Sequence, residues 1–416
     1  MMTTPRLQDA LAVLCATYLV LLQTNLALAL RSFVFGAIGV VALVLVLRRD
    51  ARAQASLSPP ACLLAAAFVA WSLWSAASLA WSRAPAYTFG ELKTDVLWLG
   101  VATAAMLLSL RETAVFRRYV ATILAAFAVL AFASLGLAMG ATPWDDKLMH
   151  HGVGTWSTHL VLVAPLILLV RASAPVGFGD GRMPTAAAVA LVVLTVASAY
   201  ATENRMVWPA LLASLAVAGA GVALRWPAPW RERGRGRAIA FAALALVIGV
   251  AFLDVALRKA ESTQLPPASI ERSVAGDPRL TIWPLVQQRI AERPLTGHGY
   301  GKEILGQELA TTLGDTTLTH AHNVFASVWL QTGAIGLALF VGLLAAAAWR
   351  FGGYARSRDD TLALVGVVGL SILAGVVVKN LTDDFFVRTN ARFLWAEVAL
   401  LVAFGERRLR SSGSEL

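Results

Sequence analysis

The feature that most constrains this chain is a series of long apolar stretches separated by short polar segments. A helix that crosses a hydrocarbon core of about 30 Å needs about 20 mostly apolar residues. Stretches of that kind recur along the whole sequence and predict about twelve transmembrane helices. The predicted helices cover residues 8–24, 31–47, 61–82, 92–110, 119–140, 156–170, 185–202, 206–224, 238–257, 322–349, 361–379 and 391–405.

The composition agrees with an integral membrane protein, because 58% of the residues are hydrophobic and only 14% are charged, whereas an average globular protein is about one quarter charged. The two cysteines, Cys15 and Cys62, both lie in apolar stretches and are too few for a disulfide framework or a zinc site. We therefore expect an all-α polytopic membrane protein. Its predicted parts are transmembrane helices 1–9 (residues 1–257), a large loop (258–320), helices 10–12 (321–405) and a tail (406–416).

The positions of lysine and arginine predict the orientation of these helices, since short cytoplasmic loops accumulate basic residues. The asymmetry is strong if both termini are cytoplasmic, and the loop 258–320 then faces the other side of the membrane. The basic run from Arg225 to Arg237, which includes Trp226 and Trp230, indicates an anchor for inner-leaflet membrane lipids. We expect no nucleic-acid partner.

The polar segment ends at His320 and His322, directly before an apolar helix. Ionisable residues at a membrane boundary are costly unless they are paired or used, so these histidines are the first candidates for chemistry. Arg205 lies in a very short turn between two predicted spans, where it either pairs with Glu203 or forms an anion site. Arg279 follows Asp-Pro at a predicted helix start and is either a solvated charge or part of the same anion site.

Asp383 and Asp384 follow the eleventh predicted span. Adjacent acids can hold a divalent cation beside a diphosphate, but we favour the interpretation that the two acids are solvated or paired with arginine, Arg388 and Arg392 being close in sequence. The sequence contains no phosphate-binding GxxxxGK[ST] loop, no serine-hydrolase elbow and no HExxH motif. We therefore expect neither a bound metal nor a cofactor.

Several motifs together resemble a known family. They are His322-Asn323 followed, after nine intervening residues, by Gly333-Ala334-Ile335-Gly336, the segment from Arg279 and Trp283 to the glycine-rich turn around His298 (residues 297–301), and Arg205 in its short turn. This pattern is similar to that of the bacterial O-antigen ligases, whose superfamily includes O-antigen polymerases and protein O-oligosaccharyltransferases. The resemblance implies a GT-C-like membrane glycosyltransferase with one long periplasmic loop that contains short helices.

The resemblance further implies that O-antigen polysaccharide is transferred from undecaprenyl diphosphate to the lipid A-core oligosaccharide, at the periplasmic face of the bacterial inner membrane. His322 would be the general base for the attacking hydroxyl, and Arg205 and Arg279 would bind the donor diphosphate. Attack opposite the diphosphate would invert the anomeric centre. Supporting roles fall to His320, Asn323, Trp283, His298, Gly333 and Gly336.

Two alternatives stay open. An O-antigen polymerase would use the same donor with a second lipid-linked glycan as its acceptor, and only the histidine-asparagine-glycine spacing favours the ligase. A membrane transporter could instead use the arginines and a histidine to bind and relay its substrate. A flux assay on vesicles would distinguish a transporter from an enzyme.

Overall fold

The computed structural model describes residues 3–24, 27–54, 57–139, 152–171, 185–226, 234–261, 278–315, 318–384, 386 and 388–412. Among these residues all regular structure is helical and no strand occurs, as the sequence predicts. The helices are α1 (Thr4–Leu22), α2 (Leu28–Leu47), α3 (Arg49–Gln54), α4 (Pro59–Ala77), α5 (Pro85–Leu92), α6 (Trp98–Ser109), α7 (Thr113–Met139), α8 (Val153–Val163), α9 (Ile167–Arg171), α10 (Thr185–Ala201), α11 (Val207–Arg225), α13 (Gly234–Glu261), α15 (Pro278–Glu292), α16 (Gly306–Leu313), α17 (Val324–Ala355), α18 (Asp360–Lys379) and α19 (Arg388–Ser412).

Within the described residues, nine helical segments are long and apolar enough to cross a membrane. Each of the twelve predicted stretches overlaps a helix, but α10 and the continuous segment Val153–Leu169 are shorter than a usual span. A multi-pass membrane protein is therefore supported, and the count of twelve stays a prediction. At the C-terminus, α19 continues to Ser412, so the predicted tail 406–416 begins inside this helix.

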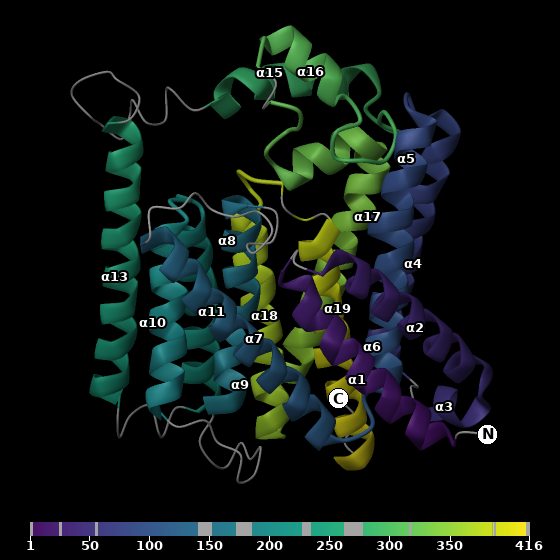
Figure 1. Cartoon of the computed structure of the whole chain (residues 1–416), viewed down its shortest axis with the longest axis vertical. Helices are drawn as coiled ribbons and strands as arrows, with labels where there is room; N and C mark the ends of the chain where they lie inside the picture. The colour runs from purple at the N-terminus through teal and green to yellow at the C-terminus, as the bar shows by residue number, and fades with distance from the viewer. Residues whose placement is uncertain are drawn as a thin grey trace.

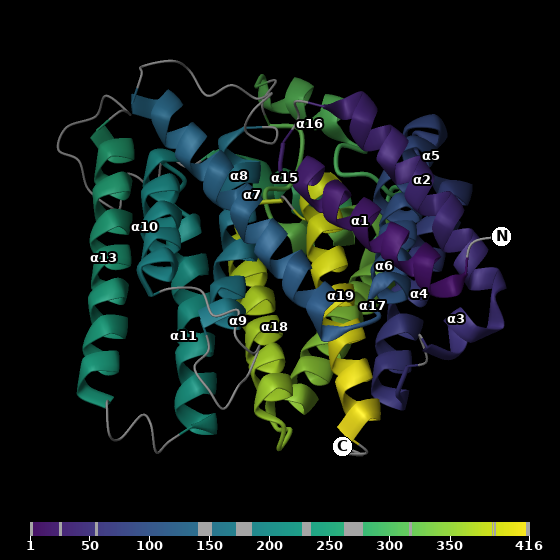
Figure 2. The same cartoon turned by 60° about the horizontal axis from the view of Figure 1, so that its bottom comes forward.

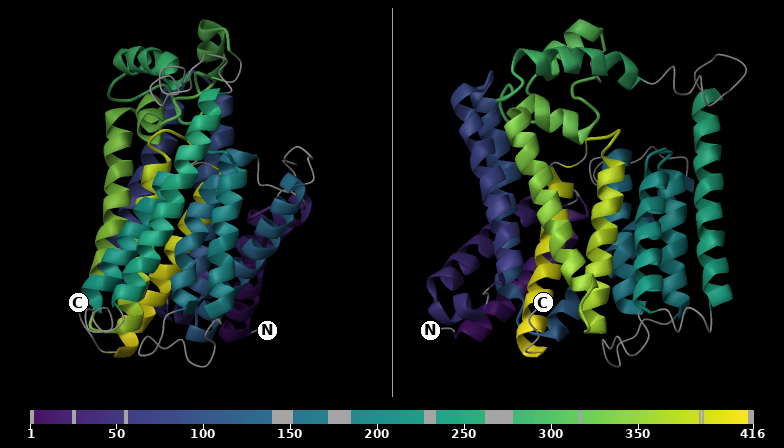
Figure 3. Two further views of the ribbon diagram at one scale, coloured as in Figure 1. Left: turned by 90° about the vertical axis from the view of Figure 1, so that its left-hand side faces the viewer. Right: turned by 180° about the vertical axis from the view of Figure 1, so that it is seen from behind.

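The long helices form a bundle, and α15 and α16 lie across one end of it (Figure 1). We call this the loop end of the bundle. The start of α1 and the end of α19 both lie toward the opposite end (Figure 1), and the end of α19 lies at the bottom in the turned view as well (Figure 2). This arrangement agrees with two termini on one side and the long loop on the other. The views from the side and from behind show α13 standing at the edge of the bundle (Figure 3).

The centre of the bundle is α18, which packs against α11, α17 and α8. Glycines on α18 allow this close packing: a Cβ atom at Gly366 would lie 2.2 Å from the backbone nitrogen of Ala355, and one at Gly375 would lie 2.5 Å from the side chain of Val161. Small residues let helix backbones approach one another in a membrane. The packing therefore fixes the end of α18 firmly at the loop end.

Helix α17 is interrupted at Gly333, whose φ of 72° and ψ of −177° are not helical. A Cβ atom there would lie 2.0 Å from the carbonyl oxygen of Leu295, so only glycine fits. The broken turn exposes backbone groups that the polar loop uses, since Ala334 N–H donates to Pro294 O (2.8 Å). The kink thus holds the loop against the first three turns of α17.

Candidate active site at the loop end

The histidine motif is joined to the connection between α18 and α19 by its asparagine. Asn323 is the N-cap of α17, and its Oδ1 accepts hydrogen bonds from the N–H groups of Phe325 (2.9 Å) and Ala326 (3.0 Å). Asn with an extended backbone is a favoured N-cap. The same side chain donates through Nδ2 to Leu381 O (2.7 Å). One residue therefore starts the helix and places the histidines beside the residues that follow α18.

His320 and His322 lie against each other, with 3.9 Å between their ring centroids. Between them, Ala321 O accepts a hydrogen bond from the indole Nε1–H of Trp283 (2.9 Å), which comes from α15. His322 has a φ of 49°, a left-handed conformation that is uncommon for residues other than glycine and is often found at functional sites. The tryptophan and the asparagine cap hold this conformation from both sides.

Arg279 reaches the same place from the first turn of α15. Its Nη2 donates to Asp383 Oδ1 (2.9 Å), and the other carboxylate oxygen of Asp383 is paired with Lys379 at the end of α18. Lys379 and Asp383 are buried, whereas the Arg279 side chain is 22% exposed. A buried charge is tolerated only when it is paired, so Asp383 holds one cation inside the bundle and orients a second at its surface.

Asp384 is also buried. Burial raises the pKa of its carboxyl group, while the positive charge of Lys302 and a hydrogen bond with Ser327 act in the opposite direction. Lys302 comes from the loop and Ser327 from α17, so both acids of the pair contact groups that the chain brings from distant segments. The site therefore contains a lysine that follows the glycine-rich turn.

His320 is half-buried, and burial lowers the pKa of its imidazole to about 2, with further lowering by the nearby basic groups of Lys302, His322 and Arg279. The Nδ1 atom of His320 lies 3.3 Å from the hydroxyl of Thr319. His320 is therefore neutral at physiological pH. A neutral imidazole beside His322 adds no positive charge to a place that already holds several cations.

The glycine-rich turn is a structural support for the site. His298 is fully buried; its Nε2 lies 2.8 Å from Arg289 O and its backbone N–H donates to Leu330 O. Burial also lowers the pKa of this imidazole. Gly301 N–H donates to Gln331 Oε1 (2.9 Å). These contacts attach the turn to α17 next to its kink.

Gly336 follows the kink, and a Cβ atom there would lie 2.0 Å from the hydroxyl oxygen of Thr332. That hydroxyl donates to Val328 O (2.9 Å), and the backbone oxygen of Thr332 accepts from Trp74 Nε1 (2.9 Å). Both glycines of the motif thus belong to the packing of α17 against the loop and α4. They shape the site by fixing this packing.

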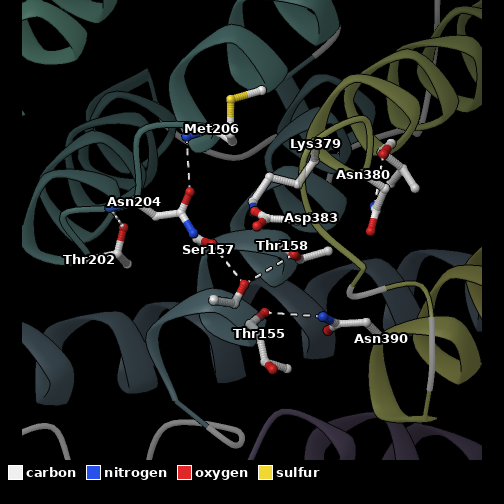
Figure 4. Close-up of polar contacts among 12 residues, drawn as sticks. Thr155, Ser157, Thr158, Thr202, Asn204, Met206, Lys379, Asn380, Asp383 and Asn390 are labelled. Carbon is white, nitrogen blue, oxygen red and sulfur yellow. Dashed lines mark hydrogen bonds and ion pairs between the residues drawn. The ribbon is translucent and has the colours of Figure 1, made fainter. Parts of the chain in front are cut away.

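The turn that contains Arg205 lies beside the Lys379–Asp383 pair (Figure 4). Asn204 shapes this turn, because its Oδ1 accepts from Met206 N–H (2.9 Å) and its own N–H donates to the hydroxyl of Thr202 (3.3 Å). Uncharged polar residues from α8 and α19 surround the same place. They include Thr155, Ser157, Thr158 and Asn390. The structure thus brings the Arg205 turn near Asp383 (Figure 4), the carboxylate that Arg279 also contacts.

Comparison with known proteins adds one match. Residues 190–341 match the family model described as O-antigen ligase. The match supports an O-antigen ligase family assignment for this chain. No curated protein matches the chain significantly. The matched segment contains Arg205, Arg279, both histidines and the kink of α17, while Lys379, Asp383 and Asp384 lie beyond it.

Asp383 is paired with an arginine, but the two arginines close in sequence were the wrong candidates. Asp383 pairs with Arg279 and Lys379, whereas the side chain of Arg388 approaches Glu91 (3.5 Å) and Arg392 Nε donates to Thr94 O (3.2 Å). The first turns of α19 direct these two arginines toward the segment before α6, away from the acids that precede them. Closeness in sequence was therefore a poor guide here, because the contacts of Arg388 and Arg392 are with residues 91 and 94.

Sequence reasoning on the O-antigen ligase motifs also missed Lys379 and Lys302. Lys379 ends a highly apolar span, and this position could have signalled a buried cation that requires an acid partner. Lys302 directly follows the glycine-rich turn, but nothing in the sequence indicates that it faces the histidines. Within the described part of the chain, no group of three or more histidine, cysteine, aspartate or glutamate side chains is arranged to hold a metal ion.

Proposed function

We propose that this protein is an O-antigen ligase, which transfers a polysaccharide from a polyprenyl diphosphate to the lipid A-core oligosaccharide with inversion at the anomeric carbon. The observation that carries the proposal is the convergence of the His320–His322 pair, Arg279 and the Arg205 turn around Asp383, in a chain whose residues 190–341 match this family. Cations next to a candidate base suit a reaction whose leaving group is a diphosphate.

The cations would stabilise the leaving group. Arginine binds phosphate oxygens through two parallel N–H donors and keeps its charge at every physiological pH. Asp383 accepts a hydrogen bond from one Nη of Arg279 and thereby orients the guanidinium, which would bind the diphosphate together with Arg205. In this scheme the bond between the anomeric carbon and the diphosphate oxygen breaks, and its electron pair remains on the diphosphate.

His322 would accept the proton of the attacking sugar hydroxyl while the new glycosidic bond forms. Histidine is suited to this role in general, because its side chain in model peptides has a pKa near 6.5 and can accept a proton at neutral pH. The contact with neutral His320 and the left-handed backbone orient the ring, and Asn323 and Trp283 hold that backbone. His320 would be a positioning residue, because its strongly lowered pKa makes it a weak base.

The choice between ligase and polymerase depends on the acceptor. The experiment uses purified protein with lipid-linked glycan and offers either lipid A-core or a second lipid-linked glycan. A product in which glycan is joined to lipid A-core supports the ligase. A longer glycan on the polyprenyl carrier, with no lipid A product, would identify a polymerase instead. Export of the substrate from vesicles without any covalent product would identify a transporter.

We also propose that the transfer is independent of metal, because Arg205, Arg279 and Lys302 supply positive charge at the site and Asp383 is already paired with two cations. Turnover should persist in the presence of a chelator, and added magnesium or manganese should not increase it. Activity that disappears with the chelator and returns with a cation would make Asp383 and Asp384 metal ligands and would contradict this proposal.

The orientation that we propose places the loop end in the periplasm and both termini in the cytoplasm of a bacterial inner membrane. Exposed positions at the two ends provide a test: Thr312 on α16 and Ser411 on α19. In a background without Cys15 and Cys62, a cysteine at position 312 should react with a membrane-impermeant thiol reagent added to intact cells. A cysteine at position 411 should not. The reverse pattern would put the histidines in the cytoplasm.

A further inference from the structure

A second group of cations lies among α1, α2, α6 and α19, apart from the elements that carry the histidines. Arg31 is on the first turn of α2, Arg392 is on the second turn of α19, and Tyr18 is near the end of α1. The positive charges of the two arginines repel each other, and the hydroxyl of Tyr18 lies beside Arg392. Two guanidinium groups that influence each other electrostatically in a membrane protein require an explanation.

Contacts on one side hold Arg392 in place. Its guanidinium lies over the ring of Trp98, 4.9 Å from the centroid, and its Nε donates to Thr94 O (3.2 Å). The ring of Phe35 lies between Trp98 (5.1 Å) and Tyr18 (5.3 Å). These aromatic contacts form a continuous wall, so Tyr18 and Arg392 are fixed relative to each other before any ligand binds.

Donors on the other side have no acceptor. Arg31 Nη1 is buried and has no hydrogen-bond partner among the described residues, and the buried hydroxyl of Tyr18, which lies beside Arg392, has no acceptor there for its own proton. Asp95 attracts Arg392, but its Oδ1 already accepts the N–H of Arg388 (3.0 Å). A buried donor without a partner costs about 1–3 kcal/mol, and more when it is charged. An anion with several oxygen atoms would satisfy Arg31, Tyr18 and Arg392 at once.

The surroundings of Arg31 indicate where such an anion comes from. Leu28, Leu30 and Phe33 flank it on α2, and their side chains are 48%, 50% and 75% exposed. On a helix that spans a membrane, exposed apolar side chains contact acyl chains. We propose that Arg31, Arg392 and Tyr18 bind the phosphate group of a membrane lipid, whose acyl chains cover this apolar surface of α2.

The test measures lipid retained by the purified full-length protein in a neutral detergent, by native mass spectrometry. The probes are phosphatidic acid and diacylglycerol with the same acyl chains. The wild-type protein should retain phosphatidic acid and not diacylglycerol. Arg31→Gln should reduce the retained lipid by about tenfold, as expected for the loss of one charge-assisted hydrogen bond. Tyr18→Phe, which keeps the aromatic contact, should reduce it less.

Arg48→Gln is the matched control, because it removes the same charge from the other end of α2 and should leave lipid retention unchanged. Three results would overturn the inference. They are equal retention by the wild type, Arg31→Gln and Tyr18→Phe proteins, equal retention of diacylglycerol and phosphatidic acid, and full displacement of the lipid by inorganic phosphate at the same concentration. The last result would indicate a site for a free anion.

Discussion

Helices α18 and α13 have nearly the same hydropathy but opposite positions in the bundle. The mean hydropathy of the most apolar window is 2.5 on α18 and 2.1 on α13, yet 78% of the first window is buried inside the protein and only 17% of the second. In a membrane, lipid is as apolar as a protein core, so apolar character does not specify burial. Burial in this bundle is therefore set by packing between helices and not by hydropathy. The candidate site depends on α18 and the helices that pack against it.

Small residues and buried charge distinguish the two regions. A Cβ atom at Gly369 of α18 would lie 2.5 Å from the ring of Phe351, whereas one at Gly249 of α13 would meet nothing within 4 Å. The ion pair at the end of α18 is buried, while that of Arg258 and Asp254 on α13 is 59% and 41% exposed. Matched substitutions in the two helices can therefore test the comparison directly.

The largest effect is expected for Asp383→Asn. This change leaves Lys379 buried without its negative partner, and breaking a buried ion pair by removing one member costs about 3–5 kcal/mol. Thermal unfolding of the purified protein should show a large decrease in the midpoint temperature, together with loss of transfer. Asp254→Asn on α13 breaks an exposed pair and should cost about 0–1 kcal/mol. Equal midpoints for the two variants would contradict the comparison.

The next effect concerns Gly369→Leu, which forces side-chain atoms into Phe351. Overpacking of this kind typically costs about 1–3 kcal/mol, and we expect a reduced yield of monodisperse protein in size-exclusion chromatography. Gly249→Leu should behave like the wild type or better, because leucine has a higher helix propensity than glycine and the position has open space. If both variants were equally well folded, α18 would not be the packed centre.

Arg279→Lys should reduce transfer by about 10- to 100-fold, which corresponds to the loss of one or two charge-assisted hydrogen bonds to the donor diphosphate. The charge is kept, so the effect reports geometry. The rate is measured with saturating acceptor and varied donor. Arg258→Lys on α13 is the control and should keep the wild-type rate. A wild-type rate for Arg279→Lys would remove the bidentate contact from the mechanism.

The smallest effect is a dependence of stability on pH. Because the folded protein lowers the pKa of His320 to about 2, the unfolded chain binds a proton below about pH 6.5 that the folded protein does not bind. Stability should therefore decrease as the pH falls below 6.5, by up to about 2 kcal/mol at pH 5. His298 acts in the same direction. His320→Gln should flatten the slope of the unfolding midpoint against pH, and an unchanged slope would refute a neutral, buried His320.

The sequence predicts the all-helical class and identifies the motifs that contain the candidate site residues, because hydropathy and motif spacing are local properties. Arg205, Arg279 and His322 were identified before any geometry was known, and their functional roles stay predictions. The partners of Asp383 could not be predicted, since Arg279 lies 104 residues away and meets it only through the packing of α15 on the bundle. The kink at Gly333 was also hidden, because a glycine in an apolar stretch is compatible with a straight helix.

The most direct test of the account is transfer by His322→Ala compared with His320→Ala, in purified proteins with lipid-linked glycan and lipid A-core. Removing a general base typically costs about 10²- to 10⁴-fold in rate, so His322→Ala should lose at least about 100-fold while its unfolding midpoint stays close to that of the wild type. His320→Ala should lose less. A rate for His322→Ala within about threefold of the wild type would contradict a catalytic role for this histidine.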